Sequence, residues 1–180
     1  MKVRPWRILA SEHMLDCRVF SVERTQSQSP IDASVHEFYR LRCVDWAQIV
    51  PVTDDDEIVM VRQYRHGSDE LSLEIPAGLI DEGETPAEAA QRECLEETGY
   101  AANELEPLGV LRPNPALFVN RLHAFATYGV KPSATIANTA TEQTEVELVP
   151  IDQLAGLMLQ GEIDHALDTA VLWRFLHVNS

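Results

Sequence analysis

The sequence predicts an α/β (α+β) fold in which a sheet of short strands is covered by a few helices. Three observations predict it. Short strand-like segments recur between turn-forming residues, one strongly capped helix lies near the middle of the chain, and two further helical segments follow at its end. Strands mixed with helices in this way are typical of a sheet with helices packed on its faces.

The first elements are predicted to be strands of a small N-terminal sheet. Residues 17–23 and 34–43 have strand-like composition, and polar residues 25–30 are predicted to be the turn between them. We therefore expect residues 1–43 to form an N-terminal hairpin or small sheet. Residues 44–180 then form the main domain, which a chain of 180 residues with 45% hydrophobic residues can fold around an ordinary core.

The main domain is predicted to alternate short strands with three helices. Strands are expected at residues 46–52, 58–64, 71–75, 108–111, 122–127 and 145–149. The two helices at the end of the chain are expected at residues 152–160 and 164–177. Asp152 and Asp164 are the expected N-caps of these two helices.

The helix at residues 85–98 has clear boundary signals. Thr85 is a suitable N-cap, Pro86 fits the first helical position, and Glu88 completes a capping box with Thr85. Gly99 supplies the left-handed residue that ends the helix.

Three glutamates of this helix, Glu93, Glu96 and Glu97, share one face because they stand at positions i, i+3 and i+4. Like charges at this spacing destabilise a helix, and they lie in the last turn, where the helix dipole favours cations. A bound divalent cation removes both penalties, since Mg²⁺ accepts carboxylate oxygens. The alternative is an acidic surface patch that Arg92 softens by pairing with Glu96.

The loop before the helix favours the metal interpretation. Gly78 and Gly83 bracket a tight turn that allows a backbone carbonyl to face a metal beside the carboxylates, and Glu84 lies just before the N-cap. Such a site suits hydrolysis of a phosphoanhydride, because a metal neutralises phosphate oxygens and lowers the pKa of a bound water. A further carboxylate is then needed to orient or deprotonate that water.

These residues together resemble the signature of the Nudix hydrolase superfamily, which is Gly, five residues, Glu, seven residues, then Arg-Glu-U-x-Glu-Glu-x-Gly-U, with U apolar. Gly78, Glu84 and the segment 92–100 fill every position, with Cys94 and Tyr100 as less usual choices at the apolar places. The resemblance implies an α/β/α sandwich with a mixed sheet. It also implies a Mg²⁺ cofactor, for which Mn²⁺ is a possible substitute.

The resemblance further assigns roles to individual residues. Glu93 and Glu97 are implied as the main metal ligands, with Glu96 assisting and the Ala77 carbonyl contributing. Arg92 is implied to orient the glutamates, and Glu84 to support the end of the helix. A glutamate on a late loop completes such sites, and here Glu142 is the first choice for the water-directing base and Glu145 the second. The alternative is that Glu142 and Glu145 only decorate a turn before a strand.

A finer resemblance, to the ADP-ribose pyrophosphatase branch, covers residues 37–176. It rests on Gln63-Tyr64-Arg65, on Leu73-Glu74-Ile75-Pro76-Ala77-Gly78, on Pro115 about sixteen residues beyond the signature, and on residues 161–166. It implies hydrolysis of ADP-ribose to AMP and ribose 5-phosphate. Arg65 is the expected clamp on the diphosphate, since a guanidinium matches phosphate oxygens in pairs, and Glu74 is expected to pair with Arg65 or contact the substrate.

Two alternatives stay open for the function. Many members carry a glycine after the downstream proline, whereas Pro115 is followed by Ala116, so another sugar nucleotide or dinucleotide, such as GDP-mannose, is a second candidate. A module that only senses ADP-ribose-like ligands is the third, although such sensors are expected to lose the signature acids. Trp46 or Trp6 are candidates for stacking on the base.

Composition limits the partners and the location. A formal net charge of −15 disfavours nucleic acid, whose phosphates would be repelled, and no apolar run is long enough to predict a membrane span. Three cysteines without CxxC spacing and the lack of a signal-peptide pattern predict a reducing, cytoplasmic location. The six histidines lack HxxxH or HExxH spacing and are interpreted as structural or surface residues. By resemblance, we expect a homodimer whose N-terminal strands help to build the nucleotide pocket.

Overall fold

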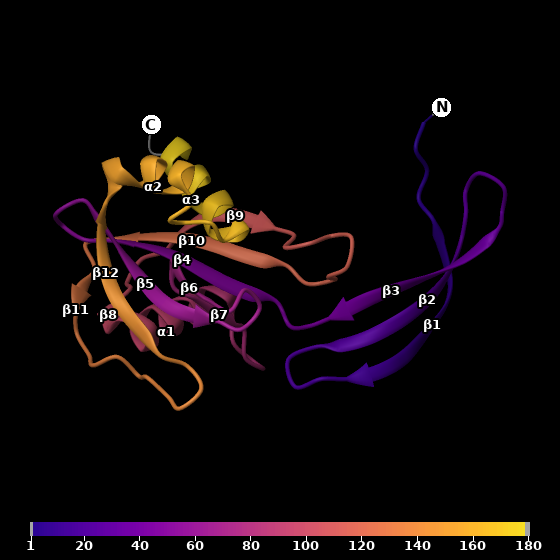
Figure 1. Cartoon of the computed structure of the whole chain (residues 1–180), viewed down its shortest axis with the longest axis horizontal. Coiled ribbons are helices and arrows are strands. Elements are labelled where there is room, and N and C mark those ends of the chain that lie inside the picture. Colours follow the sequence, from indigo (N-terminus) through magenta and orange to yellow (C-terminus); the bar gives the residue numbers. More distant parts are fainter. Residues whose placement is uncertain (1, 179–180) are drawn as a thin grey trace. The chain divides into compact units, whose positions relative to one another are not determined.

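The computed structural model describes residues 2–178 and divides into two compact units (Figure 1). The smaller unit consists of the chain up to Val44 together with Arg112–Arg121, and the larger unit contains Asp45–Leu111 and the chain from Leu122 onward. The segment 112–121 joins the smaller unit because Leu41 donates its N–H to Leu117 O at 2.9 Å and accepts the Val119 N–H at 3.1 Å.

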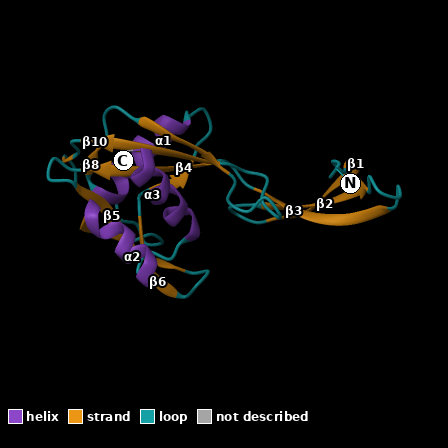
Figure 2. Cartoon of the chain, turned by 90° about the horizontal axis from the view of Figure 1, so that it is seen from above, coloured by secondary structure: helices purple, strands orange, loops and turns teal. Residues whose placement is uncertain are grey.

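The smaller unit is built around a three-stranded antiparallel sheet, and the part of it that the structure describes contains no helix (Figure 2). Its strands, in the order β1-β2-β3, are Arg7–Asp16, Ser21–Gln28 and Val35–Arg42. The predicted turn at residues 25–30 is wrong, because residues 25–28 continue β2. The turn lies later, where the Ser29 N–H reaches Ser34 O at 2.8 Å. Strand β1 was not predicted, because its apolar and polar residues do not alternate.

The larger unit holds a seven-stranded mixed sheet. Its central order is β12-β5-β4-β10-β9, with β6 paired to β5 and β7 paired to β4. Only the β4–β10 pairing is parallel. The strands are β4 Trp46–Val52, β5 Glu57–Arg65, β6 Glu70–Glu74, β7 Ala77–Leu79, β9 Glu106–Leu111, β10 Leu122–Tyr128 and β12 Thr144–Pro150; β8 Tyr100–Ala101 and β11 Lys131–Pro132 form a separate pair.

Helices cover both faces of this sheet, and β4 shows why. Its alternating side chains face opposite sides, as the pleat requires. Ala47 and Ile49 pack against helix α1 (Pro86–Thr98) in one core cluster. Val50 and Val52 belong to a second, larger cluster with residues of α2 (Leu154–Gln160) and α3 (Ala166–Val178). The predicted α/β/α sandwich with a mixed sheet is therefore confirmed.

The ends of the last two helices differ from the prediction. Asp152 is not the N-cap of α2, because it lies inside a 3₁₀ turn, Ile151–Gln153, that precedes this helix. Helix α3 starts at Ala166, two residues after the expected cap Asp164. Among the described residues, no helix is both long and apolar enough to cross a membrane.

Candidate active site

Helix α1 has the caps that its sequence predicts. Thr85 Oγ1 accepts the Glu88 N–H at 3.2 Å, and the Glu88 carboxylate accepts the Thr85 N–H at 2.8 Å. Gly99 ends the helix with φ of 74°, a left-handed conformation that favours glycine. The helix buries Ala89, Ala90 and Cys94 on the sheet, and its last turn presents glutamates along one side.

Arg92 organises the acidic side of α1. Its guanidinium donates to both Glu84 carboxylate oxygens at 2.9 Å, to Leu79 O at 2.9 Å, to Glu93 at 2.6 Å and to Glu96 at 3.3 Å. These hydrogen bonds from Arg92 lower the pKa of Glu84. Arg92 thus links the loop before the helix to Glu93, and it also makes the contact with Glu96 that belonged to the surface-patch alternative.

We expect Arg92→Lys to weaken this arrangement. A lysine ammonium has no planar fork and cannot span Glu84, Leu79 O and Glu93 at once. The loss of two or three hydrogen bonds should lower the free energy of unfolding by roughly 1–3 kcal/mol. In a chain of this size that lowers Tm by about 2–12 °C, which differential scanning calorimetry detects. An unchanged Tm would contradict the proposed tie between loop and helix.

Glu97 is the most buried of the glutamates on α1. One oxygen of the Glu97 carboxylate accepts the Ala77 N–H at 3.0 Å. The other carboxylate oxygen has no hydrogen-bond partner among residues 2–178. Burial, together with the charges of Glu93 and Glu142, raises the pKa of Glu97 to about 8. A buried carboxylate with an open oxygen beside other carboxylates fits a divalent cation.

Gly78 allows Glu93 to approach the backbone closely. A Cβ atom built on Gly78 would overlap the Glu93 carboxylate, so only glycine leaves this carboxylate in place. Burial raises the pKa of Glu93, and Arg92 opposes this shift without cancelling it. Glu93 is therefore held against strand β7, which carries Ala77 and Gly78, on the same side of α1 as Glu97.

A cavity of about 220 Å³ is lined by acidic residues of α1 and of the loop before β12. Glu142 lies on its wall, and the charge of Glu142 raises the pKa of both Glu93 and Glu97. Glu145 follows on β12 and is not among the lining residues. The lining residues are Glu93, Glu96, Glu97, Ala137, Asn138, Thr139, Glu142 and Thr144.

Arg65 and Glu74 form a close ion pair, as expected from the sequence. The Arg65 guanidinium donates to the two Glu74 carboxylate oxygens at 2.7 and 2.5 Å. Burial raises the pKa of Glu74, but Arg65 outweighs it, so this pKa lies below its usual value. Ala77, three residues after Glu74, donates its N–H to Glu97 at 3.0 Å, so the pair is linked to the cavity through a short backbone segment. Pro115 belongs to the smaller unit, and its contact with substrate stays a prediction.

His165 and Asp168 join this pair, which the sequence did not predict. His165 Nδ1 contacts the Asp168 carboxylate and lies 3.8 Å from Glu74. Asp168 is fully buried and accepts the Ile75 N–H at 2.7 Å. The available signal was the i, i+3 spacing of His165 and Asp168 at a helix start, but only the fold shows that Glu74 lies beside them.

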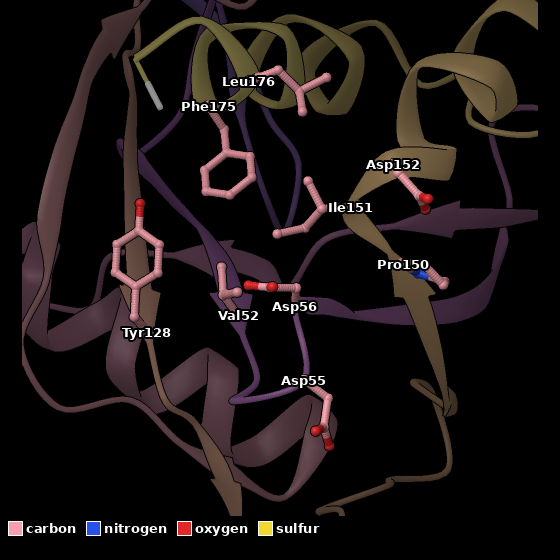
Figure 3. Close-up of a pocket in the computed structure, with 9 residues that line it drawn as sticks. All are labelled: Val52, Asp55, Asp56, Tyr128, Pro150, Ile151, Asp152, Phe175 and Leu176. Carbon is pink, nitrogen blue, oxygen red and sulfur yellow. The ribbon is translucent and has the colours of Figure 1, made fainter. Parts of the chain in front are cut away.

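A second cavity, of about 630 Å³, lies elsewhere in the larger unit (Figure 3). Asp55, Asp56 and Asp152 lie on its wall with Tyr128 and Phe175, and all three aspartates are exposed to solvent. In the glutamate cavity, by contrast, Glu97 is buried and has a carboxylate oxygen without a hydrogen-bond partner among residues 2–178, which a bound cation would satisfy. The glutamate cavity is therefore the candidate active site.

Comparison with known proteins agrees with this geometry. The chain is 28% identical over 167 residues to the ADP compounds hydrolase NudE of Escherichia coli K12, which covers 92% of this chain and 89% of the relative. It is 27% identical over 179 residues to an ADP-ribose pyrophosphatase of Mycobacterium tuberculosis, covering 94% and 83% of the two chains. A crystal structure of an ADP compounds hydrolase superimposes with a TM-score of 0.87 and 25% identity, over 98% of this chain and 95% of that one. The NUDIX domain family matches residues 45–169, and the chain belongs to this family as a Nudix hydrolase.

Proposed function

We propose that this protein hydrolyses the diphosphate linkage of a nucleoside-diphosphate sugar with Mg²⁺, and that ADP-ribose, cleaved to AMP and ribose 5-phosphate, is its substrate. The observation that carries the proposal is the buried oxygen of Glu97, which has no partner among residues 2–178 and lies beside Glu93 and Glu142 in one cavity. The adenosine part is supported by two of the relatives, whose names are ADP compounds hydrolase and ADP-ribose pyrophosphatase.

The donor set on α1 and its preceding loop suits Mg²⁺. Glu93 and Glu97 would be its main ligands, with Glu96 and the Ala77 carbonyl contributing, and Mn²⁺ is a possible substitute. When bound, Mg²⁺ neutralises phosphate oxygens and lowers the pKa of a coordinated water. Arg92 keeps Glu93 in place through its 2.6 Å hydrogen bond.

Glu142 is the residue that we assign to the attacking water. Its loop is held by Thr139, whose Oγ1 accepts the Glu142 N–H at 3.1 Å and whose N–H reaches Glu142 O at 2.8 Å. Its carboxylate would accept a proton from the water as the water oxygen bonds to phosphorus. The phosphoanhydride P–O bond then breaks, which leaves two phosphomonoesters.

We expect Glu142→Gln to lower kcat by roughly 10²-fold or more, the range typical of a general base. The amide keeps the size of the side chain but does not accept the proton. Glu145→Gln is the matched control, and its kcat should stay within about twofold, because Glu145 does not line the cavity. If the two variants behave in the opposite way, the base is Glu145.

Arg65 is assigned to the diphosphate, and the loop with Pro115 to the sugar side. The Arg65 side chain is 41% exposed even while paired with Glu74, so part of it remains accessible. A guanidinium with free N–H groups binds phosphate oxygens in pairs.

A product screen tests the substrate. Released phosphomonoesters are measured for ADP-ribose, GDP-mannose, ADP-glucose, NADH and diadenosine polyphosphates, each with Mg²⁺ or Mn²⁺. We expect the highest kcat/KM for ADP-ribose. A higher value for GDP-mannose or a dinucleotide would reassign the substrate. Tight binding of ADP-ribose without any hydrolysis would favour the sensing module.

The smaller unit favours the homodimer that we propose. Strand β1 is exposed along its whole length, and large apolar side chains stand on it, including Ile8, Leu9, Met14 and Leu15. An exposed edge strand with apolar side chains favours pairing with another chain. We propose that a second copy covers it and that this unit contributes to the nucleotide pocket. Light scattering at micromolar concentration should give twice the mass of one chain, and a monomer would contradict this.

A further inference from the structure

Four ionisable side chains from three neighbouring segments meet beside the candidate active site. Arg65 ends β5, Glu74 ends β6, Asp168 lies in the first turn of α3, and His165 directly precedes this helix. The Arg65 guanidinium donates one hydrogen bond to each Glu74 carboxylate oxygen. His165 contacts Asp168, and His165 Nδ1 lies 3.8 Å from Glu74 Oε2. The four groups therefore form one continuous network, and α3 with the residue before it supplies half of it.

The buried carboxylates of this network have partners within it or on its backbone. The side chains of Glu74 and Asp168 are 1% and 0% exposed, and buried carboxylates are stable only when they are paired. Both Glu74 oxygens accept from Arg65, and Asp168 accepts the Ile75 N–H and contacts His165, a contact that raises the pKa of His165. Ligand atoms of Glu74, His165 and Asp168 also lie within 4.8 Å of one another, but these contacts already satisfy the two carboxylates, so a metal is not required.

The network is joined to the glutamate cavity by four consecutive residues. Glu74 holds Arg65, and the next residue, Ile75, donates its N–H to Asp168 at 2.7 Å. Two residues later, Ala77 donates its N–H to Glu97 at 3.0 Å. Residues 74–77 are thus fixed at one end by α3 and at the other by α1. A shift of α3 relative to β6 would move both Arg65 and the Ala77 peptide.

We propose that His165 and Asp168 are positioning residues: they hold Glu74 and the backbone of residues 74–77 so that Arg65 is fixed for binding the diphosphate. The role of Arg65 rests on the proposed function, whereas the hold on residues 74–77 does not. Partners that orient binding residues in this way are worth about 10–100-fold where they have been removed around metal ligands.

The first test compares His165→Ala with His165→Gln, because glutamine keeps an N–H donor for the carboxylates. Calorimetry in EDTA measures the Kd for ADP-ribose without hydrolysis, and kinetics with Mg²⁺ measure KM and kcat. We expect His165→Ala to raise Kd and KM about tenfold, with kcat changed less than about threefold, since a contact made equally in ground and transition states affects KM. Glutamine should restore most of the affinity.

The matched control is Asp164→Asn. It removes a charge from the same turn, but its carboxylate is exposed and outside the network, so Kd should not change. A wild-type Kd and KM in His165→Ala would overturn the proposal. So would a rise in Tm with Zn²⁺ in the wild type that His165→Ala abolishes, because Glu74, His165 and Asp168 would then be a metal site.

The second test does not depend on the substrate. Hydrogen exchange should be at least about fivefold faster at the Ile75 amide in His165→Ala than in the wild type, because Asp168 loses the partner that holds it. Asp168→Asn takes the place of His165→Ala if that variant does not fold, and faster exchange at Ile75 is expected there too, because a neutral amide oxygen is a weaker acceptor than a carboxylate. An unchanged Ile75 amide in these variants overturns the positioning role. If the wild type neither binds nor cleaves any diphosphate in the screen, the proposed function fails. The exchange rate of the Ile75 amide still tests whether His165 and Asp168 hold the backbone of residues 74–77.

Discussion

Glu97→Gln is expected to lower kcat with Mg²⁺ by roughly 10³-fold or more, which corresponds to about 4 kcal/mol of transition-state stabilisation. Glutamine has the same shape, and its amide oxygen still accepts the Ala77 N–H. The change removes the negative charge and puts an NH₂ group where the second oxygen has no partner among the described residues. Steady-state rates with ADP-ribose measure the loss, and the exposed Glu104→Gln is the control for a change of net charge.

The fold of this variant should stay intact, and its stability provides a second measurement. Burial raises the pKa of Glu97 from 4.5 to about 8. A carboxyl with a higher pKa in the folded protein binds its proton more tightly when folded, so its contribution to stability falls as the pH rises from 4.5 through about 8. The wild type should therefore lose stability between pH 4.5 and pH 8, whereas Glu97→Gln has no titrating group at this position and should not show this loss. In EDTA at pH 8.5, we expect the Tm of Glu97→Gln to equal or exceed the wild-type Tm. Full Mg²⁺-dependent activity in this variant would refute the metal assignment.

The parts of the site that the sequence predicted are those that local patterns determine. The capping box at Thr85 and the left-handed Gly99 follow from short-range backbone chemistry, and the i, i+4 spacing of Glu93 and Glu97 puts them on one side of the helix. The central strands alternate or are wholly apolar, so most of their positions could also be predicted. Strand β1 could not, because its residues are exposed on both faces and carry no periodic pattern.

The parts that were missed depend on contacts between distant segments. Asp168 and Ile75 are 93 positions apart in the chain, and no local pattern indicates that α3 begins beside β6. The segment 112–121 similarly joins the smaller unit through backbone hydrogen bonds to Leu41. No change in amino-acid composition indicates that this segment leaves the larger unit. Long-range pairing of this kind is decided by the whole fold, so such residues are found from structure.

Gly78→Ala is the second change with a large expected effect, and it separates the metal site from the fold. The added methyl group would overlap the Glu93 carboxylate, which is the mobile end of a side chain and can turn away. The free energy of unfolding should therefore change by less than about 1 kcal/mol. Glu93 would leave its position beside Glu97, and kcat/KM should fall about 100-fold or more, equal to about 2.7 kcal/mol.

The control for this change is Gly67→Ala, since a methyl group at Gly67 meets no atom within 4 Å. An EPR titration with Mn²⁺ measures metal binding in both variants directly, independently of any substrate. We expect weaker binding in Gly78→Ala and wild-type binding in Gly67→Ala. Wild-type Mn²⁺ affinity in Gly78→Ala would mean that Glu93 is not a ligand at its present position. Because the three atoms nearest to the added methyl group all belong to the Glu93 carboxylate, that result would move the metal toward Glu97 and Glu142.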